Sequence, residues 1–259
     1  MAQTVFNRYE KKYLLSAEQY HFLQDQIDRY MEVDEYGLST ICNIYYDTED
    51  SYLIRRSIEK PEYKEKLRLR SYGIPRLDST VFLEIKKKYQ KNVNKRRIAL
   101  TLKEAYDYLE KGVRPEKNSQ ILNEIDYMVH RFPLRKNLYL AYDRVAYRMK
   151  DSSEFRMTID HNIRSRKENM GLENGDQGDL LLRDDQYLLE TKISGATPLW
   201  FTHILSEGAI MPVSFSKYGA IYKQNVDRRI PVQVPDYSAQ INYKGGLFYA
   251  DKYIPYREF

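Results

Sequence analysis

The stretch EKLRLRSYG, residues 65–73, alternates charged and apolar side chains. Because successive side chains of a β-strand point to opposite faces, Lys66, Arg68 and Arg70 share one face, and Leu67 and Leu69 share the other. Ammonium and guanidinium groups bind phosphate and carboxylate oxygens. Such a row is therefore either a solvated surface or part of an anion-binding site, and the remaining strand-like segments decide between the two.

The same alternation recurs in five further segments. The charged or polar residues that share one face are Arg8, Glu10 and Lys12; Glu84, Lys86 and Lys88; Lys95 and Arg97; Arg156, Thr158 and Asp160; and Glu190 and Lys192. One such strand is most simply a wet surface, whereas six together favour a polar interior that a polyanion fills. The carboxylates Glu10, Glu84 and Glu190 are either counter-ions of these cations or ligands of a divalent ion that bridges phosphate oxygens.

Composition excludes several other classes of site. The 42 Lys and Arg against 37 Asp and Glu leave a net charge of only +5, so anion binding must depend on where the cations lie. The single cysteine, Cys42, excludes an internal disulfide and a CxxC zinc site, and the four histidines show no metal or triad spacing. No RNP, KH or helix-turn-helix signature is present, so we expect no nucleic-acid partner. We also expect no membrane insertion and a cytoplasmic location, because no apolar run approaches the ~20 residues that span a bilayer and the N-terminus lacks a signal peptide.

Strand-like segments dominate the chain and predict an α+β fold. We expect strands at about 4–15, 39–48, 63–73, 80–90, 92–100, 137–150, 154–163 and 179–193. We expect helices at Ser16 to about Met31 and Thr101 to Lys111, opened by the capping boxes Ser16-x-x-Gln19 and Thr101-x-x-Glu104. Further helices are expected at Ser119 to Phe132, residues 197–209, and after Ser214. A closed antiparallel barrel with helices outside would bury the apolar faces and enclose the charged ones. We therefore predict one domain over 1–259, with a core at about 5–225 and an extended tail at 226–259.

The order of several motifs resembles a known family. These motifs are EKKYLL (10–15), IYYDTEDSYLIRRSIEKPEYKEKLRLRSYG (44–73), VFLEIKKK (81–88), KRRIAL (95–100), YDRVAY (142–147), LLETKI (188–193) and SFSKYGAIYK (214–223). Together they resemble the polyphosphate polymerase domain of the vacuolar transporter chaperone (VTC) group, which belongs to the triphosphate tunnel metalloenzymes. The similarity runs from about residue 5 to residue 225 and leaves the tail uncovered.

The resemblance implies an eight-stranded antiparallel tunnel that binds a nucleoside triphosphate, with ATP as the expected nucleotide, together with manganese or magnesium. The terminal phosphate would then pass to a growing polyphosphate chain. By the same resemblance Lys12, Arg68, Arg70, Lys86 and Glu190 are the expected catalytic residues, with Glu190 as the metal ligand. The expected substrate-binding residues are Lys95, Arg97, Arg144, Arg156, Ser216, Lys217 and Tyr218, and the expected orienting residues are Glu10 and Glu84.

One departure separates the chain from the hydrolytic branch of that superfamily. The hydrolases and cyclases open with ExExK, whereas this chain has Arg8 where the first glutamate would stand. The departure favours the polymerase-like branch over two-metal hydrolysis. Two alternatives stay open: a tripolyphosphatase or nucleoside triphosphatase that uses water as the acceptor, and a polyphosphate-binding module without catalysis.

Overall fold

A computed structural model describes residues 9–90 and 92–226. Its strands are β1 (Tyr9–Leu15), β2 (Met31–Asp47), β3 (Tyr63–Tyr72), β4 (Thr80–Tyr89), β5 (Asn92–Thr101), β6 (Arg135–Met149), β7 (Phe155–Arg166), β8 (Asp179–Leu180) and β9 (Tyr187–Ile193). Its helices are α1 (Ala17–Ile27), α2 (Tyr52–Ile58), α3 (Leu102–Lys111), α4 (Gln120–Arg131), α5 (Leu199–Glu207) and α6 (Lys217–Val226), with a 3-10 turn, η1, at Leu172–Asn174. The α+β class dominated by strands is confirmed.

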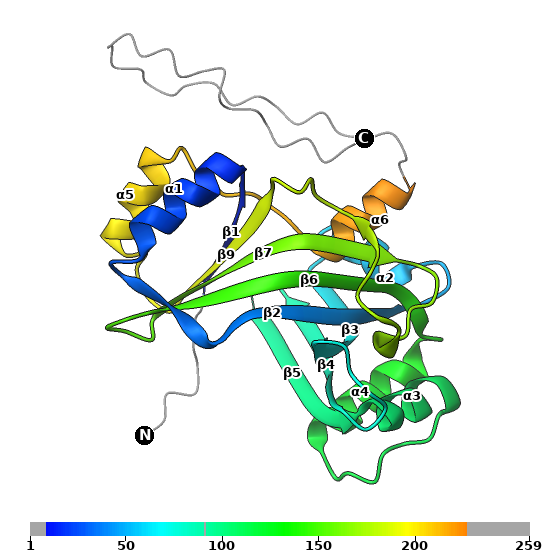
Figure 1. Ribbon diagram of the computed structural model, residues 1–259. Coiled ribbons are helices and arrows are strands. Elements are labelled where there is room, and N and C mark those ends of the chain that lie inside the picture. Colours follow the sequence, from blue (N-terminus) through cyan, green and yellow to red (C-terminus); the bar gives the residue numbers. More distant parts are fainter. Residues whose placement is uncertain (1–8, 91, 227–259) are drawn as a thin grey trace.

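The strands form one antiparallel sheet in the order β1-β9-β7-β6-β2-β3-β4-β5, with β8 paired to β7 beside this path (Figure 1). The register of the strands places the charged positions of neighbouring strands opposite one another. Arg68 lies opposite Glu84, which lies opposite Arg97, and Lys12 lies opposite Glu190, which lies opposite Thr158. The charged positions of neighbouring strands therefore fall on one shared face of the sheet.

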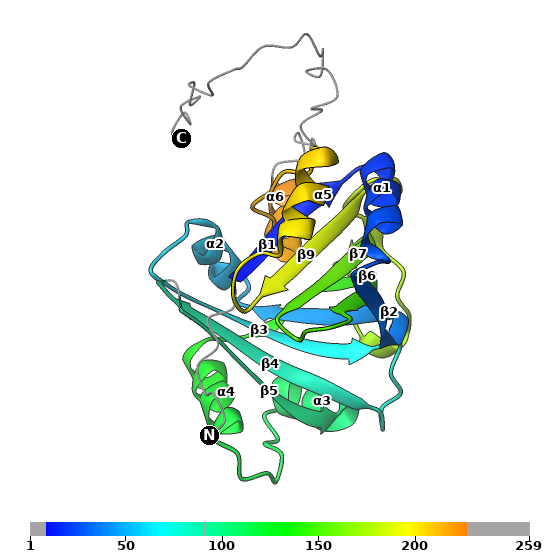
Figure 2. The ribbon, with the colours of Figure 1, turned by 90° about the vertical axis from the view of Figure 1, so that its left-hand side faces the viewer.

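The prediction of a closed barrel is wrong, because β1 and β5 are not paired in the part of the chain that the structure describes. The free edge of β1 is occupied instead by the segment before α6. Tyr13 forms a β-bridge with Pro212, and the Val213 N–H donates to the Lys12 carbonyl at 2.7 Å. The Lys12 carbonyl is thereby engaged by residue 213 and not by β5. The sheet curves but stays open between β1 and β5, a gap that we call the seam (Figure 2).

Several elements differ from the sequence prediction in their bounds. The strand expected at 179–193 divides into β8 and β9 around a turn, which gives nine strands in the described residues instead of eight. Helix α2 was not anticipated, and β2 begins at Met31, well before the expected start at residue 39. Residues 4–8 of the first predicted strand, including Arg8, lie outside the described residues, as does the predicted tail beyond residue 226.

Four helices cover the outer face of the sheet. Helices α3 and α4 pack on β2 to β5 through a core that includes Ile44, Leu67 and Leu83. Helices α1 and α5 pack on β1, β7 and β9 through a second core. The capping boxes predicted from the sequence are both present, at Ser16 before α1 and at Thr101 before α3. The apolar faces of the strands are thus buried against these helices, as expected.

Helix α6 lies on the opposite, inner face of the sheet, together with α2. Tyr45 and Leu140 pack against Tyr218 and Ile221 of α6. Tyr45 alternates along β2 with Ile44 and Tyr46, and Leu140 alternates along β6 with Tyr139 and Ala141. These neighbours belong to the core beneath α3 and α4, so the two groups lie on opposite faces. An expectation of helices only on the outside therefore does not hold, and α6 brings its N-terminal residues to the charged inner face.

Candidate functional site

The first charged cluster surrounds Glu84 on the inner face of β3, β4 and β5. Its carboxylate accepts a hydrogen bond from Arg68 Nε at 2.6 Å and pairs with Lys95 Nζ at 2.9 Å, and Arg70 Nε lies 3.9 Å away. Glu84 is only 1% exposed. Burial alone would raise the pKa of this carboxyl, but the three cations, led by Arg68, lower it to about 2. The sequence assigned all four residues to the site, and the fold brings them together.

Aromatic and amide groups hold the two arginines from the side of β2 and β6. Arg70 donates to the Asn43 amide oxygen at 2.9 Å and to the Tyr142 hydroxyl at 3.1 Å. Arg68 donates to the Tyr45 hydroxyl at 3.3 Å. Burial would raise the pKa of Tyr45, but the charges of Arg68 and Lys66 lower it to about 8. Both guanidinium groups are therefore fixed in place from two sides.

The second cluster joins Glu190 of β9 to Asp160 of β7 through Lys217. The Lys217 ammonium lies 2.5 Å from Asp160 and 3.0 Å from Glu190. Arg144 donates two hydrogen bonds to Asp160, at 2.5 and 2.7 Å, and Lys12 lies 3.3 Å from Glu190. Burial would raise the pKa of Glu190, but these cations, led by Lys217, hold it well below its usual range. Three cations thus share two buried carboxylates.

Tyr218 explains how Lys217 reaches this cluster. Its hydroxyl lies 2.9 Å from both the Asp47 carboxylate and the Asn137 amide oxygen, and its ring stacks on Tyr45 at 4.4 Å. Asp47 also accepts the backbone N–H groups of Leu53 and Ile54 in the first turn of α2. The first turn of α6 is therefore tied to β2 and α2 while the adjacent Lys217 enters the charged face.

The remaining predicted residues lie at or near these clusters with fewer contacts. Lys86, Arg97 and Arg156 are exposed and form no ion pair with another described residue. Arg97 stacks on the Phe82 ring at 4.6 Å. Glu10 pairs with Lys12 at 3.4 Å, and the Ser216 hydroxyl accepts from the Gly219 N–H at 3.3 Å, which caps α6. Ser216 and Tyr218 thus hold the helix, while their direct contact with a substrate stays a prediction.

Several inner-face residues were not selected by motif. Asp160, Lys66 and Lys192 follow the same alternation that selected their neighbours, so periodicity alone could have placed them in the site. Asn43, Tyr45 and Tyr142 lie in the apolar-looking runs ICNIYY and LAYD, where nothing in the sequence indicates that they would hold an arginine. The roles of Asn43 and Tyr45 depend on the pairing of β2 with β3, and that of Tyr142 depends on the pairing of β2 with β6.

The carboxylates of Glu190 and Glu10 could hold a divalent ion only if a bound phosphate supplied further ligands. The described residues contain no group of three or more His, Cys, Asp or Glu side chains that could hold a metal. Mg²⁺ commonly binds one or two carboxylates and takes its other ligands from water and substrate phosphates. Glu190, with Glu10 on the neighbouring strand β1, matches that donor set. Every described helix is too short or too polar to cross a membrane.

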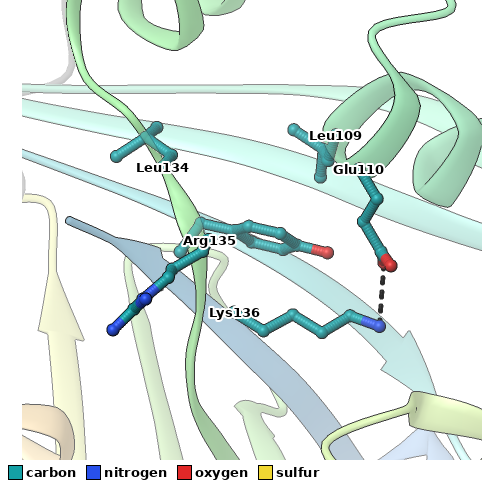
Figure 3. A pocket seen from close by; sticks show the side chains of 6 residues that line it. Leu109, Glu110, Leu134, Arg135 and Lys136 are labelled. Carbon is teal, nitrogen blue, oxygen red and sulfur yellow. Dashed lines mark ion pairs between the residues drawn. The ribbon is translucent and has the colours of Figure 1, made fainter. Parts of the chain in front are cut away.

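Two cavities are lined mainly by residues outside the paired clusters. One, of about 400 Å³, opens at the seam and is lined by residues 10–12 of β1, Lys88 of β4 and residues 212–215. The other, of about 370 Å³, lies on the helix-covered side between α3 and the start of β6. There the Lys136 ammonium pairs with Glu110 at 2.8 Å (Figure 3). Only the seam cavity is continuous with residues of the charged face, through Lys12 and Glu10.

Comparison with known proteins adds sequence and fold relationships to this geometry. The family described as the VTC domain matches residues 7–225. The vacuolar transporter chaperone complex subunit 4 of Trypanosoma brucei brucei is 27% identical over 213 residues, which cover 65% of this chain and 27% of that protein. The chain therefore spans about a quarter of the length of this curated relative.

Two solved structures share the fold. One is a candidate adenylate cyclase from Bacillus halodurans, with a TM-score of 0.51 and 19% identity, covering 80% of this chain and 92% of its own. The other is a candidate adenylyl cyclase from Hippeastrum described with a dominant triphosphatase activity, with a TM-score of 0.51 and 15% identity, covering 83% and 95%. At these identities the likeness concerns the fold alone.

Proposed function

The chain belongs to the family of VTC domains, and from this premise we propose that it is a polyphosphate polymerase. The enzyme would transfer the terminal phosphate of a nucleoside triphosphate, ATP in the first instance, to the end of a polyphosphate chain. The observation that carries the proposal is the convergence of Arg68, Arg70 and Lys95 with Lys12, Arg144 and Lys217 on one sheet face. Among the described residues these six cations meet three buried carboxylates, Glu84, Glu190 and Asp160, so their charge is only partly neutralised.

Phosphoryl transfer suits such a face because the protein contributes mainly position and charge. The attacking group would be a terminal phosphate oxygen of the acceptor, which is already ionised at neutral pH and needs no general base. A bond forms between that oxygen and the γ-phosphorus, the bond from the γ-phosphorus to the bridging oxygen breaks, and the nucleoside diphosphate leaves. Cations fixed in advance stabilise the negative charge that spreads over these oxygens.

In the proposal, the two clusters bind different phosphate groups of the substrate. Arg68 and Arg70, held by Glu84 and Asn43, present guanidinium groups to the triphosphate. Lys12 and Lys217, at the second cluster, would neutralise the phosphate groups nearest Glu190. The exposed cations Lys86, Arg97 and Arg156 would contact the acceptor or product chain. A divalent ion held by Glu190 and the phosphates would supply further charge neutralisation.

The test is a product analysis with purified protein, ATP and either Mn²⁺ or Mg²⁺. Products are separated on a gel stained for polyphosphate, and orthophosphate is measured in parallel. Glu190→Gln keeps the shape of the side chain but removes its charge. Lys103→Met serves as the matched control, because Lys103 is an exposed lysine of α3 on the outer side of the sheet.

A ladder of long chains that depends on a divalent ion and disappears in Glu190→Gln supports the proposal. Lys103→Met should give the wild-type ladder. Release of orthophosphate without chains would replace the polymerase with a triphosphatase. Phosphate binding that needs no divalent ion and leads to no turnover would leave a binding module in which Glu190 is only an ion-pair partner.

A further inference from the structure

Lys66 is the one cation of EKLRLRSYG whose role the two clusters leave open. In the strand pairing it lies directly opposite Lys86 of β4, and Lys86 lies directly opposite Lys95 of β5. Side chains at directly opposite positions on one sheet face are close neighbours, and like charges placed there repel. Three lysines therefore form a single row across three strands.

The members of this row differ in how their charge is compensated. Lys95 reaches Glu84 at 2.9 Å. The ammonium groups of Lys66 and Lys86 form no ion pair or hydrogen bond with another residue in 9–90 and 92–226. Lys86 is exposed, so water solvates it, whereas Lys66 is partly buried. Lys66 is thus a partly desolvated ammonium without a protein counter-ion.

The groups around Lys66 come from five elements. Tyr45 faces it from β2, Lys86 from β4 and Lys12 from β1. Lys64 lies two residues away on the same face of β3, and the ring of Tyr218 in α6 lies 5.8 Å from the Lys66 ammonium. None of these groups is a carboxylate. Lys66 therefore lies between the two clusters. Its neighbour Arg68 belongs to the Glu84 cluster, and Lys12 belongs to the Glu190 cluster.

We propose that Lys66 is a further substrate-binding residue, which contacts a phosphate group held between the two clusters. The proposal rests on the polyphosphate function proposed above and adds a residue to it. A phosphate oxygen would supply the missing counter-ion of Lys66 and separate its charge from that of Lys86. Polyphosphate presents one charged group after another, so one chain can satisfy this row and both clusters at once.

The expected proton uptake follows from the environment of the free protein. Burial lowers the pKa of Lys66 to about 8. Tyr45 opposes this shift, and the neighbouring lysines Lys64, Lys86 and Lys12 add to it. At pH 8 about half of the Lys66 side chains are then neutral. A bound phosphate raises the pKa again, because it favours the charged ammonium. Binding at pH 8 should therefore add a proton to part of the Lys66 population, a contribution that variants of Lys66 lack.

The experiment is calorimetry of tripolyphosphate binding at pH 8, without nucleotide, in two buffers that differ in ionisation enthalpy. The difference in apparent enthalpy gives the number of protons taken up. Lys66→Met should weaken binding about tenfold to a hundredfold, the effect of one charge-assisted hydrogen bond. Lys66→Met should also lower the number of protons that the protein takes up on binding tripolyphosphate. Lys103→Met should match the wild type in both quantities, and thermal unfolding of each variant checks that it is folded.

Lys66→Arg separates phosphate contact from a structural role. Arginine stays charged at pH 8, so this variant should bind tripolyphosphate within a few-fold of wild type but take up fewer protons. Uptake should not vanish, because the pKa values of Lys95 and Tyr45 also lie at about 8. Unchanged affinity in Lys66→Met, or unchanged uptake in Lys66→Arg, would overturn the assignment. Wild-type protein that binds with uptake but makes no chains would contradict the polymerase and leave Lys66 as a phosphate ligand.

Discussion

Replacement of Glu84 by glutamine tests how the arginine cluster is held. Glu84 is the only carboxylate that the described residues place against Arg68, Arg70 and Lys95. Glutamine has nearly the same shape and mimics the protonated acid, so Glu84→Gln compares a charged with a neutral group at a fixed position. We expect the substitution to lower the free energy of unfolding at pH 7, because three cations would then lie together without their counter-ion.

The magnitude follows from linkage between protonation and folding. The pKa of Glu84 falls from an ordinary 4.5 to about 2 in the folded protein. A depressed pKa stabilises the folded state above the unfolded pKa, and this contribution is lost as pH falls toward the folded pKa. The shift corresponds to about 3 kcal/mol at pH 7, falling to about 1.5 kcal/mol at pH 3.

Urea denaturation of wild type and Glu84→Gln at pH 7 and pH 3 measures this difference. Other groups titrate in both proteins, so their contributions cancel in the comparison. Glu124→Gln is the matched control, because Glu124 also pairs with two cations, Lys87 and Arg96, but on the outer side of the sheet. The free energy of unfolding of Glu124→Gln should stay within about 1 kcal/mol of the wild-type value at both pH values. A wild-type advantage over Glu84→Gln that does not shrink at pH 3 would refute the reasoning.

Three further predictions concern α6 and the charged face. Tyr218→Phe removes the hydroxyl that lies 2.9 Å from Asp47, so the free energy of unfolding in urea should fall by about 1–3 kcal/mol, and an unchanged value would contradict the link. Lys217→Met leaves two buried carboxylates facing each other, and differential scanning calorimetry should show a loss of about 3–5 kcal/mol, smaller in Lys217→Arg. Tripolyphosphate affinity should fall steeply as salt rises, and Arg68→Gln should flatten that dependence; equal slopes would argue against a phosphate contact at Arg68.

Alternation predicted the inner face well because it is a local property. A side chain two residues from Arg68 lies on the same face of β3 in any sheet, so Lys66 and Arg70 could be placed from the sequence. The capping boxes at Ser16 and Thr101 were equally local, since each joins residues three apart. Such features need no knowledge of which strands are neighbours.

Contacts between distant segments could not be predicted in the same way. That Asn43 and Tyr142 would hold Arg70 depends on the pairing of β2 with both β3 and β6. Barrel closure was an economical way to remove two exposed edges, but the sequence does not reveal that the chain beside Pro212 lies along β1 instead. The inward position of α6 likewise follows from Tyr218 and Asp47, which are 171 residues apart.

The seam beside β1 has a topological consequence for a polymeric ligand. A chain inside a closed ring can enter or leave only by threading one of its ends. Along the described strands β1 and β5 are unpaired, and the cavity between β1, Lys88 and residues 212–215 opens at this seam. Under the proposed function, a polyphosphate chain on the inner face would therefore lie in a sheet whose described strands do not close into a ring around it, so its release would not have to follow the threading of an end through such a ring.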